Sequence, residues 1–194
     1  MRKAIVITGT PGVGKTTVGT LLARRLGAEP VELGALVERE GLHEGLDEET
    51  GSLIVDLGAL SKRIIELIAS KPDRTFVVIG HYAQNVVPRE LVLRAFVLRR
   101  DPRELRSVLI ARGYSGRKLY ENLQAEILDV CLYEAVEAYG PGLVYEVDVS
   151  GREPIEVVEE MEEALEGGLS RVGIVDWLGL LEREGELDEF FSEF

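Results

Sequence analysis

A short stretch near the start of the chain has the residue types and spacing that bind a triphosphate. Residues 9–16 read GTPGVGKT, which matches the pattern G-x-x-x-x-G-K-S/T. Glycines such as Gly12 and Gly14 let the backbone wrap around a polyphosphate and turn its N–H groups inward. Lys15 can then reach the β- and γ-phosphate oxygens, where it would act catalytically. The stretch predicts binding of a nucleoside triphosphate such as ATP, and it does not identify the acceptor of the phosphate.

The two threonines after the lysine extend this prediction to a metal ion. In loops of this pattern the first hydroxyl, here that of Thr16, ligates Mg²⁺. Thr17 can add a contact nearer the α-phosphate. We therefore expect ATP and Mg²⁺ to be the cofactors, with Thr16 as the metal-binding residue.

His81 is a candidate catalytic residue, because it follows an apolar run that reads as a buried strand. Beside a phosphate loop it could position water or a phosphate oxygen. The alternative is a histidine that local hydrogen bonds satisfy. We read His43, in an acidic stretch, as solvated, and no metal-ligand spacing joins the two histidines.

Several basic residues could supply mobile positive charge for phosphoryl transfer, which depends mostly on positioning and charge neutralisation. Arg112 precedes Gly113, and Gly116 follows three residues later, which is typical of a closing lid. The other members of this basic set are Arg99, Arg100, Arg117 and Lys118. The alternative is pairing with carboxylates on helix surfaces, which we prefer for Arg103 and Arg106.

The elements that must position these residues alternate along the chain. Apolar runs predict strands at residues 3–8, 30–33, 75–79, 94–99 and 143–147. Helical spacing predicts helices at residues 15–26, 34–40, 56–70, 101–112, 116–139 and 154–166, joined in part by a Gly-rich acidic connection at 41–51. The expected fold is α/β, a three-layer parallel five-stranded sheet of the P-loop NTPase and nucleoside monophosphate kinase type. Ligands in such sheets bind at the carboxyl ends of the strands, where the phosphate loop, His81 and Arg99 fall.

Nearly the whole chain resembles the atypical adenylate kinases linked to small-ribosomal-subunit maturation, in their archaeal form. The stretches that carry the resemblance are GTPGVGKTT at 9–17, DEETGSLIVDL at 47–57, GHYA at 80–83, LRRDP at 98–102, RGYSGRKLYENLQAE at 112–126 and VDWL at 175–178. The resemblance implies a monophosphate-binding segment at about 33–55 and a short lid at about 111–121, with Arg112 contacting ATP. It also implies reversible transfer of the ATP γ-phosphate to AMP, dAMP or another nucleoside monophosphate, with some ATP hydrolysis. The implied partners are a small-subunit ribosomal protein and the 30S subunit.

The chain departs from this family two residues before His81. Relatives generally have an acidic residue there that could hold Mg²⁺, and here the position is Ile79. Magnesium would then rest on Thr16, phosphates and water, with Asp101 as a possible helper, although Asp101 better suits a helix cap. Acidic residues of the monophosphate segment could accept hydrogen bonds from a ribose or a base, and they are Asp47, Glu48, Glu49 and Asp56. For Asp56 we favour a helix N-cap.

Composition bounds the remaining possibilities. The chain has 194 residues and a formal net charge of −13, which argues against direct binding of free nucleic acid and favours a basic protein partner or simple solubility. No apolar run reaches membrane-spanning length and none near the N-terminus suits a signal peptide, so we expect a cytoplasmic protein with no membrane partner. The single cysteine, Cys131, reads as a buried, inert thiol.

The domain division that we expect is a kinase domain at residues 1–168 and a helical tail at 169–194. The tail could pack back on the domain, dimerise or bind a partner, and packing back is the default.

Two other functions compete with the kinase. One is a ribosome assembly factor that uses an ATPase switch, with incidental kinase activity. The other is a small-metabolite kinase of the shikimate or gluconate type, which the lid sequence does not support.

Overall fold

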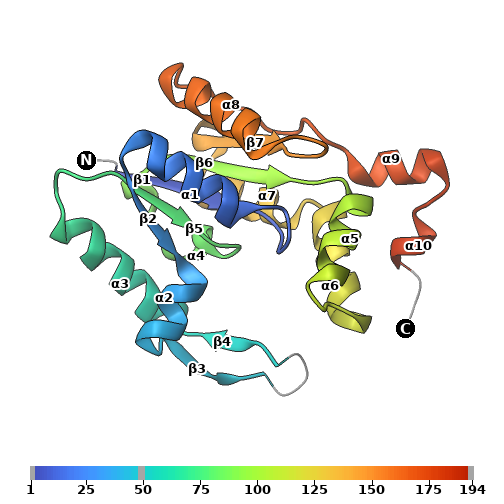
Figure 1. The fold of residues 1–194 in the computed structure, drawn as a ribbon, viewed down its shortest axis with the longest axis horizontal. Helices are drawn as coiled ribbons and strands as arrows, with labels where there is room; N and C mark the ends of the chain where they lie inside the picture. The colour runs from blue at the N-terminus through green and yellow to red at the C-terminus, as the bar shows by residue number, and fades with distance from the viewer. Residues whose placement is uncertain (1–2, 48–50, 192–194) are drawn as a thin grey trace.

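The computed structural model describes residues 3–47 and 51–191. Its centre is a five-stranded parallel sheet in the order β2-β5-β1-β6-β7 (Figure 1). The strands are β1 Ala4–Thr8, β2 Glu29–Glu32, β5 Phe76–Ile79, β6 Val92–Arg99 and β7 Val144–Asp148. Each lies close to its predicted range, and the α/β fold is confirmed.

Helices cover both faces of this sheet because successive side chains of a strand point to opposite sides. On β1, Ile5 and Ile7 belong to one hydrophobic core, whereas Ala4 and Val6 belong to the other. The first core is covered by α1 Lys15–Leu26, α5 Pro102–Ala111, α6 Gly116–Ile127 and α8 Pro154–Glu166. The second is covered by α2 Leu33–Glu40, α3 Leu57–Ser70, α4 Ala83–Val86 and α7 Val130–Tyr139. The three expected layers are present.

Two predicted caps begin their helices as expected. The Asp56 side chain accepts a hydrogen bond from the Ala59 amide at 2.8 Å and starts α3. Asp101 accepts one from the Arg103 amide at 2.8 Å and starts α5, with Pro102 in its first turn. Asp101 also bonds the Arg103 guanidinium, so both oxygens of its carboxylate have partners on α5.

The connection at residues 41–51 contains structure that the sequence did not predict. His43–Leu46 (β3) and Leu53–Val55 (β4) pair as an antiparallel hairpin that extends from the body beside α2 (Figure 1). These short strands were not predicted because glycine, which is frequent in this connection, is a poor strand former. Glu48 and Glu49 lie outside the described residues.

The single helix predicted at residues 116–139 is wrong. Helix α6 ends at Ile127, and α7 begins at Val130. Asp129, between them, has a φ of 59°, which a helix interior excludes. Its carboxylate pairs with Arg99, and this tertiary contact accompanies the break.

The C-terminal segment packs back on the sheet. A parallel bridge joins Arg171 to Tyr145 of β7. Beyond it, α9 Trp177–Glu184 and α10 Asp188–Phe191 bury Trp177, Leu181 and Phe190 in the same core as α5 and α6. Two short 3₁₀ turns, Arg89–Leu91 and Pro141–Leu143, complete the described elements. Within residues 3–47 and 51–191, no helix is long and apolar enough to cross a membrane.

Candidate active site at the carboxyl edge of the sheet

The phosphate loop joins β1 to α1 and depends on its glycines. Gly9, Gly12 and Gly14 have φ values of 133°, 94° and 106°, which favour glycine. A Cβ at Gly9 would lie 2.4 Å from the carbonyl oxygen of Leu98, and one at Gly12 would lie 2.9 Å from the Leu105 side chain. At Gly9 and Gly12 the loop therefore passes too close to its neighbours for larger residues.

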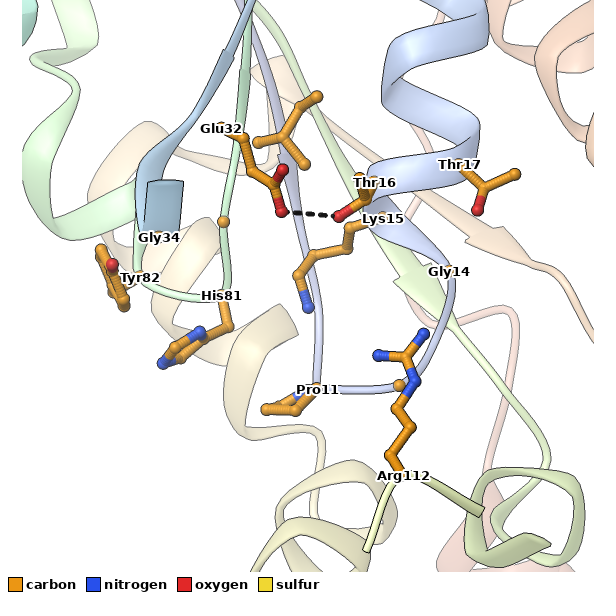
Figure 2. Close-up of a pocket in the computed structure, with 13 residues that line it drawn as sticks. Pro11, Gly14, Lys15, Thr16, Thr17, Glu32, Gly34, His81, Tyr82 and Arg112 are labelled. Atoms are coloured by element: carbon orange, nitrogen blue, oxygen red, sulfur yellow. Dashed lines mark hydrogen bonds between the residues drawn. The ribbon is translucent and has the colours of Figure 1, made fainter. Parts of the chain in front are cut away.

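Lys15 bends back over this loop, as Figure 2 shows. Its amine donates hydrogen bonds to the carbonyls of Gly9 at 2.7 Å and Thr10 at 2.9 Å. Desolvation by the surrounding loop lowers the pKa of Lys15 to about 8. The amine is thus poorly solvated, and two backbone carbonyls hold it.

Thr16 contacts a carboxylate that the sequence interpretation overlooked. Its hydroxyl donates to Glu32 at 2.9 Å, and Glu32 is the last residue of β2 (Figure 2). Ile79, where the family resemblance led us to expect an acid, is buried and packs on Gly19 of α1. The rule that sites form at carboxyl ends of strands could have identified Glu32, since β2 ends at the same edge.

His81 follows β5 and lines the same cavity as Lys15 and Thr16. Desolvation and the positive charge of Lys15 lower the pKa of His81 to about 4, so the imidazole is neutral at pH 7. Its ring meets that of Tyr82 edge to face, with centroids 4.4 Å apart. Its carbonyl accepts a hydrogen bond from Gln84 at 3.1 Å, which holds the backbone.

Arg112 is the C-cap residue of α5, and its side chain points toward the phosphate loop in Figure 2. It lines three cavities. One also contains Lys15 and His81, one lies beside Arg152, and one is lined by residues 112–115, 117–118 and 121. Within the described ranges, no carboxylate forms an ion pair with its guanidinium. Gly113 and Gly116 have φ values of 84° and 51°, so the chain turns sharply on either side of residues 114–115.

The sequence of this chain matches a known family model and several known proteins. The family model "AAA domain" matches residues 5–129. "Putative adenylate kinase" of Thermococcus onnurineus is 42% identical over 174 residues, covering 89% of this chain and 90% of the relative. The protein of the same name from Methanothermobacter thermautotrophicus is 41% identical over 180 residues, covering 91% and 98%. The chain therefore belongs to the family of these proteins named "Putative adenylate kinase".

Solved structures agree with this P-loop kinase family at the level of the fold. Shikimate kinase from Acinetobacter baumannii has a TM-score of 0.62 and 17% identity, covering 86% of this chain and 94% of that one. Shikimate kinase from Bacteroides thetaiotaomicron has a TM-score of 0.53 and 20% identity, covering 84% and 98%. At these identities the likeness establishes the architecture and nothing about the acceptor.

One predicted site residue of this kinase is wrong. Arg99 is buried and pairs with Glu126, Asp129 and Glu146, so it supplies no mobile charge to a substrate. Although burial alone would lower the pKa of Arg99, Glu126 and Asp129 raise it above its ordinary value. The prediction failed because a strand-end arginine reads the same whether it faces a ligand or buried acids.

The other basic residues divide as follows. Arg103 pairs with Asp101 and Glu184, and Arg106 with Glu189, as preferred from the sequence. Arg117 pairs with Glu121 on the exposed face of α6. Arg100 pairs with Glu104 and lines a cavity at the site, and Lys118 lines a second cavity together with Arg117.

Cys131 differs from the sequence prediction in its surroundings. It is partly exposed rather than fully buried, and its sulfur lies 4.0 Å from the Thr10 hydroxyl. Desolvation raises the pKa of the thiol to about 11, so it is protonated at neutral pH. It is therefore a poor nucleophile, as expected, although it contacts the phosphate loop.

Proposed function

We propose that this protein is a nucleoside monophosphate kinase that transfers the γ-phosphate of ATP reversibly to AMP, dAMP or a related monophosphate. The observation that carries the proposal is one cavity that joins the phosphate loop, Arg112 and the start of α2. Lys15 and Thr16 line one side, and Gly34 and Tyr82 line another. A donor on the loop and an acceptor against α2 would then meet between Lys15 and Arg112.

The transfer step requires stabilisation of the charge on the moving phosphoryl group. Lys15 would exchange its bonds to the Gly9 and Thr10 carbonyls for phosphate oxygens, which are stronger acceptors. Arg112 would add a second cation from the opposite side. Neutral His81 can accept or donate one hydrogen bond, which suits holding an acceptor oxygen or, in the ATPase reaction, a water.

Thr16 and Glu32 are the residues that would hold Mg²⁺. A hydroxyl and a carboxylate 2.9 Å apart form an oxygen donor set of the kind that Mg²⁺ accepts, together with phosphates and water. No group of three or more metal-ligating side chains occurs in the described part of the chain, and Mg²⁺ does not require one. Bound Mg²⁺ would neutralise the β- and γ-phosphate charge. We propose that Glu32 provides the carboxylate that is missing at Ile79.

The cavity beside the loop suits the base of ATP. It lies between the helix-end Arg112 and the turn after β7, and it is lined by Val108, Val149, Arg152 and Pro154. Arg152 is held by the Asp148 carbonyl at 2.9 Å and by the Glu160 carboxylate. A flat base between arginine planes and apolar side chains gains both stacking and cation–π energy.

A coupled assay with ATP and a panel of acceptors tests the proposal. We expect phosphorylation of AMP or dAMP well above the rate of ATP hydrolysis. The panel includes shikimate and gluconate, because the fold is shared with kinases of small metabolites. Transfer to one of those and to no monophosphate would replace the proposal with a metabolite kinase.

We also propose that residues 33–55 and 111–121 close as monophosphate-binding and lid segments on a kinase domain of residues 1–168, with 169–194 as its tail. Lys118 of α6 donates to Ser52 at 2.8 Å, so the two segments already touch. Nucleotide-dependent slowing of hydrogen exchange in both segments would support closure. Unchanged exchange at saturating ATP analogue and AMP would contradict it.

A second role, assistance in small-subunit assembly, is favoured by the charge. The net charge of −13 attracts basic proteins, and ribosomal proteins are basic. The test is binding to isolated small-subunit ribosomal proteins with and without ATP, measured over a range of salt. Nucleotide-dependent release together with no monophosphate transfer would favour an ATPase switch over the kinase.

A further inference from the structure

A buried polar cluster beside the phosphate loop has no part in the proposed transfer step. Its charged members are Glu126 of α6, Arg99 of β6 and Glu146 of β7, each no more than 1% exposed. Buried charges cost free energy unless partners satisfy them, so their contacts indicate what they fix in place.

Glu126 joins three parts of the chain that are far apart in the sequence. One carboxylate oxygen accepts a hydrogen bond from the Thr10 hydroxyl at 2.6 Å. The other accepts from the Arg99 guanidinium at 2.9 Å and from the indole N–H of Trp177 at 3.2 Å. The phosphate loop, the end of β6 and the first residue of α9 therefore meet on one carboxylate.

Thr10 connects this carboxylate to the catalytic lysine. Its side chain is buried, and its carbonyl is one of the two that accept from the Lys15 amine. A shift of Glu126 would move the Thr10 hydroxyl and, with it, the carbonyl that faces Lys15. The loop can bind phosphate only while its backbone keeps this shape.

The C-terminal segment also forms hydrogen bonds to a second acid of this cluster, Glu146. Glu146 accepts from Arg99 at 2.7 Å through one oxygen and from the amide of Ile174 at 2.8 Å through the other. The backbones of Arg171 and Glu146 also bond, at 2.7 Å. Residues 171–177 therefore form hydrogen bonds to Glu126 and Glu146, and Arg99 pairs with both of these acids.

We propose that Glu126 is a positioning residue for the phosphate loop, and that docking of residues 171–181 sets its position through Trp177. Nucleotide affinity and docking of this segment are then coupled, and each strengthens the other. A protein that displaces the segment would loosen nucleotide, and bound nucleotide would hold the segment down. The proposal rests on nucleotide binding by the loop and not on the identity of the acceptor.

Calorimetric titration with Mg-ADP tests the coupling without any kinase assay. The variants are Thr10→Val, which removes the loop hydroxyl, Trp177→Phe, which keeps an aromatic ring without the N–H, and their combination. A hydrogen bond to a buried carboxylate suggests about a 10-fold loss of affinity for each single variant. Because both act through Glu126, the double variant is expected to bind about as weakly as Thr10→Val alone.

The matched control is Thr20→Val, the same change at an exposed position of α1, and it is expected to bind ADP like wild type. Additive losses in the double variant would overturn the proposal, as would wild-type affinity in Trp177→Phe. Glu126→Gln is a further variant, and its thermal unfolding must be measured beside its affinity. Lower stability with wild-type ADP affinity would show that the cluster only stabilises the fold, which also contradicts the proposal.

The reverse direction of the coupling has its own readout. Saturating Mg-ADP is expected to slow hydrogen exchange of residues 171–181 in wild type and in Thr20→Val. In Thr10→Val the same saturation is expected to leave that exchange unchanged. Equal protection in Thr10→Val would overturn the coupling even if the protein proved to phosphorylate no monophosphate at all.

Discussion

Arg112 is a cation with no carboxylate partner among the described residues, and its side chain points toward the phosphate loop (Figure 2). Replacement of Arg112 by alanine is expected to lower transfer to monophosphate by at least about 10–100-fold, since arginines that stabilise this transition state contribute roughly 10³-fold or more. The measurement is kcat in the coupled assay. Arg24→Ala, at the exposed end of α1, is the control, and equal rates for the two variants would refute the lid assignment.

Glu32 lines the cavity at the site, although the sequence did not predict it there. Glu32→Gln is expected to raise the Mg²⁺ concentration needed for tight ADP binding by about 10-fold, since Mg²⁺ sites of this type rely on one or two carboxylates. Titration calorimetry with ADP at several Mg²⁺ concentrations measures this without turnover. Glu29→Gln, at the other end of β2, is the matched control. An identical Mg²⁺ dependence in the two variants would exclude Glu32 from the metal site.

Lys15 links the site to the pH dependence of stability. Its pKa is about 8 in the folded chain against 10.5 for an ordinary lysine, so between these values the unfolded chain holds the proton that the folded chain has lost. Stability must therefore rise with pH across this window. The free energy of unfolding of wild type relative to Lys15→Met is expected to increase from pH 8 to about pH 10. Denaturant titrations at both pH values measure it, and parallel pH curves would contradict the shift.

At the scale of elements, the approach of α1 to β5 depends on one glycine. A Cβ at Gly19 would lie 2.6 Å from the Ile79 side chain. Gly19→Ala is therefore expected to destabilise by about 1–3 kcal/mol through overpacking, although alanine is the better helix former. Gly34→Ala, on α2 with nothing within 4 Å of the new methyl group, serves as the control in denaturant unfolding. Equal stability of the two variants would mean that α1 adjusts freely.

The same contact explains why the position of Ile79 was hard to interpret from sequence. Strands β1, β5 and β6 and helix α1 could be predicted, because each has a local pattern of apolar spacing or a glycine-rich turn. What Ile79 faces depends on Gly19, which lies 60 positions earlier. Arg99 was misread for a related reason, since Glu126 and Glu146 lie 27 and 47 positions away. Lys15 and Thr16 could be located from a motif of adjacent residues, and Arg112 from its neighbouring glycines and the family resemblance. All three line one cavity, and their roles stay predictions.

At the scale of the whole molecule, the C-terminal segment is part of the core that holds the phosphate loop. Leu181 is fully buried, whereas Leu178, on the same short helix, is 39% exposed. Leu181→Ala is expected to cost about 2–5 kcal/mol of unfolding free energy. Leu178→Ala is expected to cost much less. Thermal and denaturant unfolding compare them, and equal small losses would show a segment that adds little to the core.

Trp177 is the only tryptophan in the chain, and it is buried with its indole nitrogen against a carboxylate. Ultraviolet excitation at the red edge of protein absorption therefore reports on a single site. Its emission spectrum reports the polarity and hydration of the junction between α9 and the Glu126 carboxylate of α6. The molecule carries a built-in optical probe, which needs no label and lies outside the nucleotide cavity.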